Sequence, residues 1–325
     1  MTQLVGRRPI VAPQDLIGAL VPPPHFAEVR FDTYEPDPGF PSQRQALNAT
    51  QEFVKGLGGR SGLKRAGNNS SGKGIYLDGG FGVGKTHLLA SMAHAAGKNA
   101  AFGTFVEYTH VVGALGFQAA RTALQQFRLV CIDEFELDDP GDTVMMARLM
   151  RELADAGIAL AATSNTLPES LGQGRFAADD FKREIQAVAS VFAVVTIDGP
   201  DYRHRGDLEF VSATPKDVPA LATQQGASVA DWASLVADLS HVHPSRMGAY
   251  VDGITTLGLE NVQPLTDQAS ALRVVTLVDR LYDRDVTVVA SGESLGEIFP
   301  ADMLRGGFRK KYYRALSRLA AMAER

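Results

Sequence analysis

The sequence predicts an α/β fold in which helices flank a five-stranded parallel sheet, and two observations support this prediction. Between residues 74 and 197, short apolar runs alternate with segments whose apolar residues recur at the spacing of a helix. The run at residues 129–132 is apolar without interruption, as is typical of a parallel strand that is buried on both faces. Strands that alternate with helical crossovers form parallel sheets with helices on both sides.

The expected elements follow one another along the chain. Strands are expected at residues 74–77, 100–107, 129–132, 158–163 and 193–197. Helices are expected at residues 42–56, 85–96, 142–156 and 179–189. Beyond residue 200 the pattern is less regular, with helices near 230–239 and 269–282, a strand at 286–290 and a basic helix from 307.

A stretch rich in Gly, Ser and Asn at residues 58–72 marks a domain boundary, because such composition favours turns and loops. We therefore expect an N-terminal arm with one helix at residues 1–66. A core domain would follow at 67–200, and a mixed α/β region at 201–325.

Composition excludes several classes of protein. The 325 residues carry a net charge of −5, which gives no support to a protein that coats nucleic acid through bulk charge. No apolar run approaches the roughly 18 residues of a membrane span. The only cysteine, Cys131, excludes an internal disulfide and fits a reducing compartment. We therefore expect a cytoplasmic protein.

The most informative motif joins the first expected strand of the core to the helix at 85–96. It consists of Gly79, Gly80, Phe81, Gly82, Val83, Gly84, Lys85 and Thr86. This order fits the phosphate-binding loop G-x-x-x-x-G-K-[ST] in its expected strand–loop–helix context. Glycines let backbone N–H groups surround a phosphate, and the start of the helix adds its positive dipole end. The motif predicts a P-loop fold that binds ATP.

Individual side chains of this motif have expected roles. Lys85 would bridge the β- and γ-phosphates, and the Thr86 hydroxyl would bind Mg²⁺. His87 follows directly and is included among the residues expected to contact the nucleotide.

Polar residues follow the third and fourth strands of the core. Asp133 is expected to hold Mg²⁺, and Glu134 to orient the attacking water. Asn165 comes just after the strand at 158–163 and would reach the γ-phosphate, because ligands bind at the carboxyl ends of parallel strands. The alternative for Asn165 is a turn residue that precedes Pro168.

Arginines could complete the site of a neighbouring subunit, since a cation there neutralises charge that develops on the γ-phosphate. Arg175 is the leading candidate, and Arg183, Arg203 and Arg205 are others. The alternative is that they are solvated surface residues.

Two further segments have open interpretations. The pair Gly116-Phe117 could be a loop that grips a substrate, or an ordinary loop. The helix from 307 combines an apolar stripe with a basic face, which we interpret as solvated, although it could contact nucleic acid or bring an arginine to the nucleotide.

Taken together, these motifs resemble the AFG-one-like ATPases over about residues 22–323. The matching segments are residues 31–38, 41–43, 131–135, 162–165 with Pro168, 201–203, 277–283, 288–291 and 317–319. Many ATPases share the nucleotide motifs, whereas the segments at 277–283 and 317–319 are much more specific. The resemblance also aligns Arg175 with an Arg-Phe pair of the family.

The resemblance implies an AAA+-type ATPase that uses Mg²⁺ and assembles into homo-oligomers whose subunits complete each other's sites. A bacterial member of this family is associated with cell division and the FtsZ polymer, which implies remodelling of an FtsZ-type partner. Two other functions stay open. The run at 84–89 is also similar to DNA-linked initiators and helicase loaders, and the chain could be a nucleotide-binding scaffold with little turnover.

Overall fold

The computed structural model describes residues 3–10, 12–57, 74–135, 140–167, 182–200 and 217–323. The described residues divide between two compact units. The sheet unit takes its residues from Ala12–Pro22 and Phe26–Tyr202, and the C-terminal unit takes its residues from Met1–Val11, Pro23–His25 and Arg203–Arg325. None of the described helices is both long enough and apolar enough to cross a membrane.

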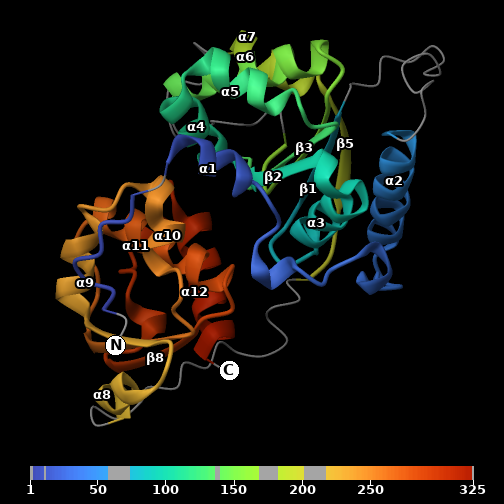
Figure 1. Ribbon diagram of the computed structural model, residues 1–325. Coiled ribbons are helices and arrows are strands. Elements are labelled where there is room, and N and C mark those ends of the chain that lie inside the picture. Colours follow the sequence, from blue (N-terminus) through green and yellow to red (C-terminus); the bar gives the residue numbers. More distant parts are fainter. Residues whose placement is uncertain are drawn as a thin grey trace. The chain divides into compact units, whose positions relative to one another are not determined.

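The sheet unit contains a five-stranded parallel sheet in the order β2-β3-β4-β1-β5 (Figure 1). Its strands are β1 (Gly74–Gly79), β2 (Ala100–Thr104), β3 (Leu129–Asp133), β4 (Ala159–Ser164) and β5 (Phe192–Ile197). The predicted α/β fold with a P-loop sheet is therefore confirmed. All five strands lie within a few residues of their expected positions.

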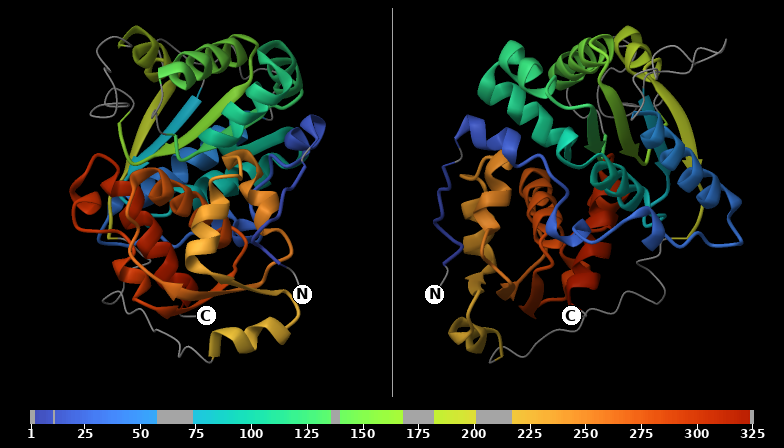
Figure 2. Two further views of the ribbon diagram at one scale, coloured as in Figure 1. Left: turned by 90° about the vertical axis from the view of Figure 1, so that its left-hand side faces the viewer. Right: turned by 45° about the vertical axis from the view of Figure 1, so that its right-hand side comes forward.

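Helices cover both faces of this sheet (Figures 1 and 2). One face carries α2 (Pro41–Leu57) and α3 (Lys85–Ala96). The other carries α4 (Phe105–Leu115) and α6 (Pro140–Asp155), with α5 (Phe117–Leu124) and α7 (Lys182–Ala189) packed on α6.

Strand alternation divides the core between the two faces. In β1, Ile75 and Leu77 are buried in the cluster that includes α3, whereas Tyr76 is buried in the cluster that includes α4 and α6. The alternation in β3 is the same, with Cys131 on the α3 side and Ile132 on the other. The sheet is thus buried on both faces, as the uninterrupted apolar runs predict.

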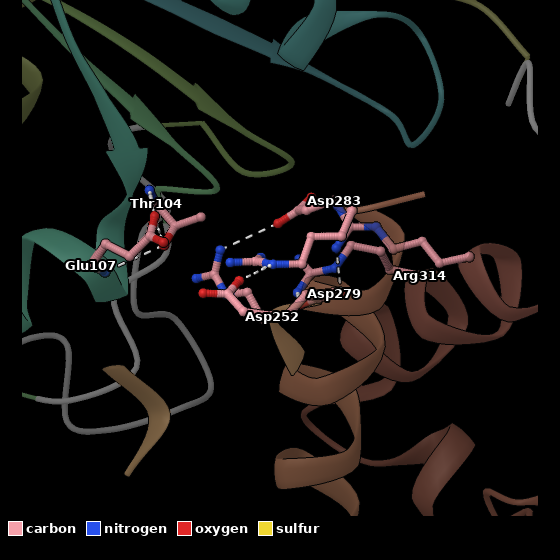
Figure 3. A network of polar contacts seen from close by, with 9 residues as sticks. Thr104, Glu107, Asp252, Asp279, Asp283 and Arg314 are labelled. Carbon is pink, nitrogen blue, oxygen red and sulfur yellow. Dashed lines mark hydrogen bonds and ion pairs between the residues drawn. The ribbon is translucent and has the colours of Figure 1, made fainter. Parts of the chain in front are cut away.

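The second strand is shorter than expected, because Thr104 ends it by capping α4. The Glu107 N–H donates to Thr104 Oγ1 at 3.3 Å, and the Thr104 N–H donates to Glu107 Oε2 at 2.7 Å (Figure 3). This reciprocal capping box begins a helix at Phe105, so the expected strand at 100–107 is wrong over its last three residues.

The pair Gly116-Phe117 does not form the expected loop. Gly116, with a φ of +79°, is the single residue between α4 and α5, and Phe117 begins α5. The Arg148 guanidinium lies 4.3 Å from the centre of the Phe117 ring. The connection at this position is therefore a single residue between two helices, and a substrate-gripping role stays a prediction.

The residues before the sheet contribute to both units. Helix α2 packs on β5 and α3 within the sheet unit, and a second short helix, α1 (Pro13–Gly18), was not expected. Leu4 is fully buried in the C-terminal unit, where its N–H donates to Ser228 Oγ at 3.2 Å. The expected boundary at 58–72 lies outside the described residues.

The C-terminal unit has a second parallel sheet, in the order β6-β7-β8. Its elements are α8 (Asp217–Ala220), β6 (Ala227–Asp231), α9 (Trp232–Leu239), α10 (Met247–Val251), β7 (Thr256–Val262), α11 (Gln268–Tyr282), β8 (Thr287–Gly292) and α12 (Arg309–Ala323). The expected strand at 286–290 and all three expected helices are confirmed.

Strands β6 and β7 were missed by the sequence analysis. Gly258 in the middle of β7 weakens the strand pattern. A Cβ at this glycine would lie 2.9 Å from Val218 Cγ1, so close packing explains the residue.

Helix α12 differs from the expected solvated basic helix. Arg314 donates to Asp279 Oδ2 of α11 at 2.8 Å, and Arg318 donates to Asp279 Oδ1 (Figure 3). Only 7% and 8% of the two arginine side chains are exposed, so this part of the basic face is interior. Asp279 and Arg318 come from the two most family-specific segments, which an ion pair thus joins.

Candidate nucleotide site

The strand order brings the predicted site residues together. Strand β4 lies between β1 and β3, and all three strands run in the same direction. Their carboxyl ends are therefore neighbours, which is the position where parallel α/β sheets bind ligands. The residues at or just beyond these ends include the phosphate loop, Asp133 and Asn165.

The phosphate loop leaves β1 at Gly79 and enters α3 at Lys85. Gly84 has a φ of +88°, and a Cβ there would lie 2.4 Å from Cε2 of Tyr34. Glycine is required at this position because both the backbone and the space exclude a side chain. At Gly80, in contrast, a Cβ would meet nothing within 4 Å, so the loop backbone is open to an approaching group.

The start of α3 is suited to an anion. Its first intrahelical bond runs from the Leu88 N–H to Gly84 O at 3.1 Å. The preceding N–H groups have no acceptor within the helix and lie at its positive end. Gly84 caps the helix without a side chain, so these amides are not covered by a capping group.

The Lys85 ammonium group lies beside Asn165 and the phosphate loop. Lys85 Nζ donates to Asn165 Oδ1 at 2.8 Å, to Gly79 O at 2.9 Å and to Gly80 O. The ammonium group is therefore held between the loop backbone and the end of β4.

The side chains of Thr86 and Asp133 lie next to each other. Thr86 Oγ1 donates to Asp133 Oδ1 at 3.1 Å, and Asp133 is only 5% exposed. A carboxylate beside a hydroxyl suits Mg²⁺, which prefers oxygen ligands and keeps several waters. These two residues fit the ion. Within the described ranges, no group of three or more His, Cys, Asp or Glu is arranged to hold another metal.

Glu134 follows Asp133 in an unusual backbone conformation. Its φ is +52°, which is uncommon for a residue with a Cβ. Its N–H donates to Thr163 Oγ1 at 3.1 Å, and the Phe135 N–H donates to Thr163 O at 2.7 Å. Such strained residues cluster at functional sites, which agrees with the expected position of Glu134.

Thr163 was not singled out by the sequence analysis. Its hydroxyl also donates to Asp133 Oδ1 at 2.5 Å. The register pairs Ile132 with Ala162, so the next residues, Asp133 and Thr163, are neighbours. The signal that could have found this contact is the order of β3 and β4 in the sheet, which the motifs do not specify.

His87 lies against a segment that precedes the sheet. Its Nε2 is 3.0 Å from both Arg30 O and Thr33 Oγ1. The pKa of His87 is lowered, because burial lowers it more than the hydrogen bond with the Arg30 carbonyl raises it. Its expected contact with a nucleotide stays a prediction.

The same segment braces the phosphate loop. The Tyr34 hydroxyl donates to Val83 O at 3.0 Å, and the Tyr34 ring packs edge-on against His87 at 5.4 Å between centroids. In the sequence, Tyr34 stands out only as part of the segment at residues 31–38 that resembles the family. Its contact with the loop could not be read from local pattern, since 49 positions separate Tyr34 from Val83.

The arginines expected to act across a subunit interface are not assigned by this geometry. Arg175, Arg203 and Arg205 lie outside the described residues. Arg183 is exposed on α7. Their roles stay predictions.

Comparison with known proteins identifies the family of the chain. The family model for AFG1-like ATPase matches residues 10–218 and 216–325. The cell division protein ZapE of Escherichia coli (strain K12) is 27% identical over 295 residues, which cover 77% of this chain and 78% of ZapE. Lactation elevated protein 1 homolog B of Danio rerio is 26% identical over 277 residues, covering 67% of this chain and 55% of that protein.

Among solved structures, AMPPCP-bound DnaA from Aquifex aeolicus matches with a TM-score of 0.40 and 15% identity. The match covers 55% of this chain and 51% of that one. The family match covers nearly the whole chain, and the phosphate loop, Asp133 and Asn165 converge at one edge of the sheet. The chain belongs to the AFG1-like ATPase family, and its parallel sheet and phosphate loop form a P-loop fold.

Proposed function

We propose that this protein is a magnesium-dependent ATPase that hydrolyses ATP to ADP and phosphate. The observation that carries the proposal is the convergence of Lys85, Asn165, Thr86 and Asp133 through hydrogen bonds of 2.8 and 3.1 Å. These are the residue types that phosphoryl transfer requires, because it depends on positioning and on neutralising charge.

Each residue has a separate role in this proposal. Lys85 binds the β- and γ-phosphates, together with backbone N–H groups of the loop. Asn165 contacts the γ-phosphate. Thr86 and Asp133 would hold Mg²⁺, which neutralises charge on the phosphate oxygens when it is bound. Glu134 orients the attacking water and accepts its proton.

The test compares phosphate release by the wild type and Glu134→Gln. We expect the variant to bind ATP with wild-type affinity and to lose about 10²- to 10⁴-fold in turnover, the usual contribution of a general base. Glu293→Gln, which changes an exposed glutamate of the C-terminal unit, is the matched control and should behave as the wild type. Equal rates for wild type and Glu134→Gln would remove Glu134 from the mechanism. ATP binding without phosphate release by the wild type would favour a nucleotide-binding scaffold.

We further propose that the protein assembles into homo-oligomers in which Arg175 completes a neighbouring subunit's site. Arg175→Ala should bind ATP but turn over slowly. Mixing it with Glu134→Gln should restore part of the activity, because some interfaces then combine an intact Glu134 with an intact Arg175. Arg183→Ala is the comparison variant, since Arg183 is exposed on α7. Failure to restore activity would argue against a role across the interface.

The partner we propose is an FtsZ-type division polymer, on the basis of similarity to the cell division protein ZapE. Glu134→Gln with ATP should co-sediment with FtsZ polymers more than the same variant with ADP. Equal sedimentation in both nucleotides would contradict ATP-dependent remodelling. Turnover that is stimulated by DNA and falls steeply with salt would instead favour the DNA-linked alternative.

A further inference from the structure

We propose that Thr163 is a positioning residue that fixes the orientation of the Asp133 carboxylate and the backbone of Glu134. The inference rests on the proposed function, because it concerns the Mg²⁺ ligand and the water-orienting residue of the same site. Thr163 lies near the end of β4, is 2% exposed, and contacts three consecutive residues at the end of β3.

The Thr163 hydroxyl accepts one hydrogen bond and donates another, and the direction of each follows from its partner. A threonine hydroxyl has one hydrogen to donate and lone pairs to accept. The Glu134 N–H can only donate, and it points to Thr163 Oγ1 at 3.1 Å. The hydroxyl hydrogen is therefore directed to Asp133 Oδ1, 2.5 Å away. One hydroxyl thus orders the backbone of one residue and the side chain of its neighbour.

Hydrogen bonds to one oxygen of Asp133 limit the rotation of its carboxylate. Thr86 Oγ1 donates to the same oxygen, Asp133 Oδ1, at 3.1 Å. Two hydroxyls from different elements, α3 and β4, therefore approach a single oxygen. Two such bonds restrict rotation of the carboxylate, and hydrogen-bonded partners of metal ligands commonly change metal affinity or activity 10- to 100-fold.

The backbone at Glu134 is strained, and Thr163 contacts it. Glu134 has a φ of +52°, and such a conformation persists only where surrounding contacts determine it. Thr163 accepts two hydrogen bonds from this strained segment. Its Oγ1 accepts from the Glu134 N–H, and its carbonyl oxygen accepts from the Phe135 N–H at 2.7 Å. Removing the hydroxyl releases the first contact and leaves the second, so the fold is retained while the turn loosens.

The test uses Thr163→Val, which keeps the shape of the side chain and removes the hydroxyl, and Thr163→Ser, which keeps the hydroxyl. Thr50→Val is the matched control: Thr50 is fully buried and donates only to the Ala46 and Leu47 carbonyls within α2. A fluorescent, nonhydrolysable ATP analogue is titrated at increasing Mg²⁺ and in EDTA. Amide hydrogen exchange is followed at Glu134 in protein without nucleotide, and turnover is measured with ATP.

For Thr163→Val we expect the Mg²⁺ concentration for half-maximal effect to rise about 10- to 100-fold, turnover to fall by a similar factor, and the Glu134 amide to exchange faster. Nucleotide affinity in EDTA should stay within about twofold of the wild type, because Lys85 and the loop are unchanged. Thr163→Ser should recover most of the loss. Should Thr163→Val not fold, Thr163→Ala compared with Thr163→Ser asks the same question.

The proposal is overturned if Thr163→Val matches Thr50→Val in Mg²⁺ dependence and in exchange at Glu134. It is also overturned if Thr163→Ser is as impaired as Thr163→Val, since shape would then matter and the hydroxyl would not. Failure of the proposed function looks different. The wild type would then release no phosphate, while exchange at Glu134 would still report whether Thr163 holds the turn.

Discussion

The nucleotide site and the Asp279 cluster of the C-terminal unit each contain a carboxylate with little exposure, but they surround it differently. Asp279 accepts from two arginines, Arg314 and Arg318, on one neighbouring helix. Asp133 accepts from two hydroxyls, Thr86 and Thr163, at the carboxyl edge of a parallel sheet. The comparison teaches that burial of charge does not by itself mark a functional site. The groups next to the carboxylate and its position in the fold decide whether it belongs to a functional site.

The physical reason lies in what each neighbour can compensate. A buried ion pair needs good geometry and further contacts to offset the desolvation of both charges. Around Asp279 the guanidinium groups supply opposite charge, and Tyr282 packs 5.2 Å from the Arg318 guanidinium. Around Asp133 the hydroxyls orient the carboxylate at a position where a cation can bind. We therefore interpret the Asp279 cluster as structural and the surroundings of Asp133 as a binding site.

The largest expected effect is the loss of ATP turnover in Asp133→Asn, which separates the metal-binding role of Asp133 from the structural role of Asp279. Asp133→Asn should lower ATP turnover at least about 100-fold, because stabilisation by a bound metal ion is worth several kcal/mol. Its free energy of unfolding should change much less than that of Asp279→Asn. Phosphate release and urea unfolding, measured on both variants, check this. If Asp133→Asn retained turnover, the metal-binding role of Asp133 would be wrong.

The second prediction concerns the Asp279 cluster. Asp279→Asn should lower the free energy of unfolding of the C-terminal unit by about 3–5 kcal/mol, since it leaves two buried arginines without their carboxylate. Asp252→Asn is the control, because its pair with Arg284 involves an aspartate side chain that is 63% exposed. That pair should contribute less than about 1 kcal/mol. Equal urea midpoints for the two variants would contradict the structural role of Asp279.

A smaller effect is expected at the phosphate loop. Gly84→Ala should destabilise the protein by about 1–2 kcal/mol and weaken nucleotide binding, because φ is +88° and the new Cβ would meet Tyr34. Gly113→Ala is the matched control, since a Cβ at Gly113, in the last turn of α4, would meet nothing within 4 Å. Thermal unfolding and nucleotide titration measure the two effects. A Gly84→Ala protein as stable as Gly113→Ala would show that the loop adjusts freely.

The sequence predicts the nucleotide site better than the rest of the molecule, for a physical reason. The loop and α3 are set by consecutive residues, so the helix begins at Lys85 and ends at Ala96 as expected. The contacts of Thr163 depend on which strands are neighbours, and those of Tyr34 depend on a segment distant along the chain. Neither follows from local spacing.

The C-terminal unit was predicted less well because two kinds of residue misled the pattern. Arg314 and Arg318 are spaced by one helical turn, and charged residues in such a pattern usually face solvent. Here they turn inward to Asp279, which only the packing of α11 on α12 reveals. Gly258 likewise concealed β7, since glycine inside a strand weakens its signal.

The smallest expected effect depends on pH. Burial by itself raises the pKa of Asp238. Hydrogen bonds from Arg8, the Gly6 N–H and the Tyr250 hydroxyl together lower it by more than burial raises it, so the pKa is below its ordinary value. A lowered pKa in the folded chain stabilises it above the unfolded pKa of about 3.9, and this contribution is lost as the pH falls through the folded value. Asp238→Asn should therefore be less stable than the wild type near pH 7, with the difference shrinking in acid. Urea unfolding as a function of pH checks this, and a constant difference would contradict it.

The central claim is that the loop at residues 79–86 holds the phosphates of ATP through Lys85. The most direct test is equilibrium titration of ATP in the presence of Mg²⁺ with the wild type, Lys85→Ala and Lys98→Ala, an exposed lysine just beyond the other end of α3. The account predicts that Lys85→Ala weakens binding about 10- to 100-fold, the usual worth of a hydrogen bond to a charged group, while Lys98→Ala binds as the wild type does. Equal affinities for all three proteins would contradict it.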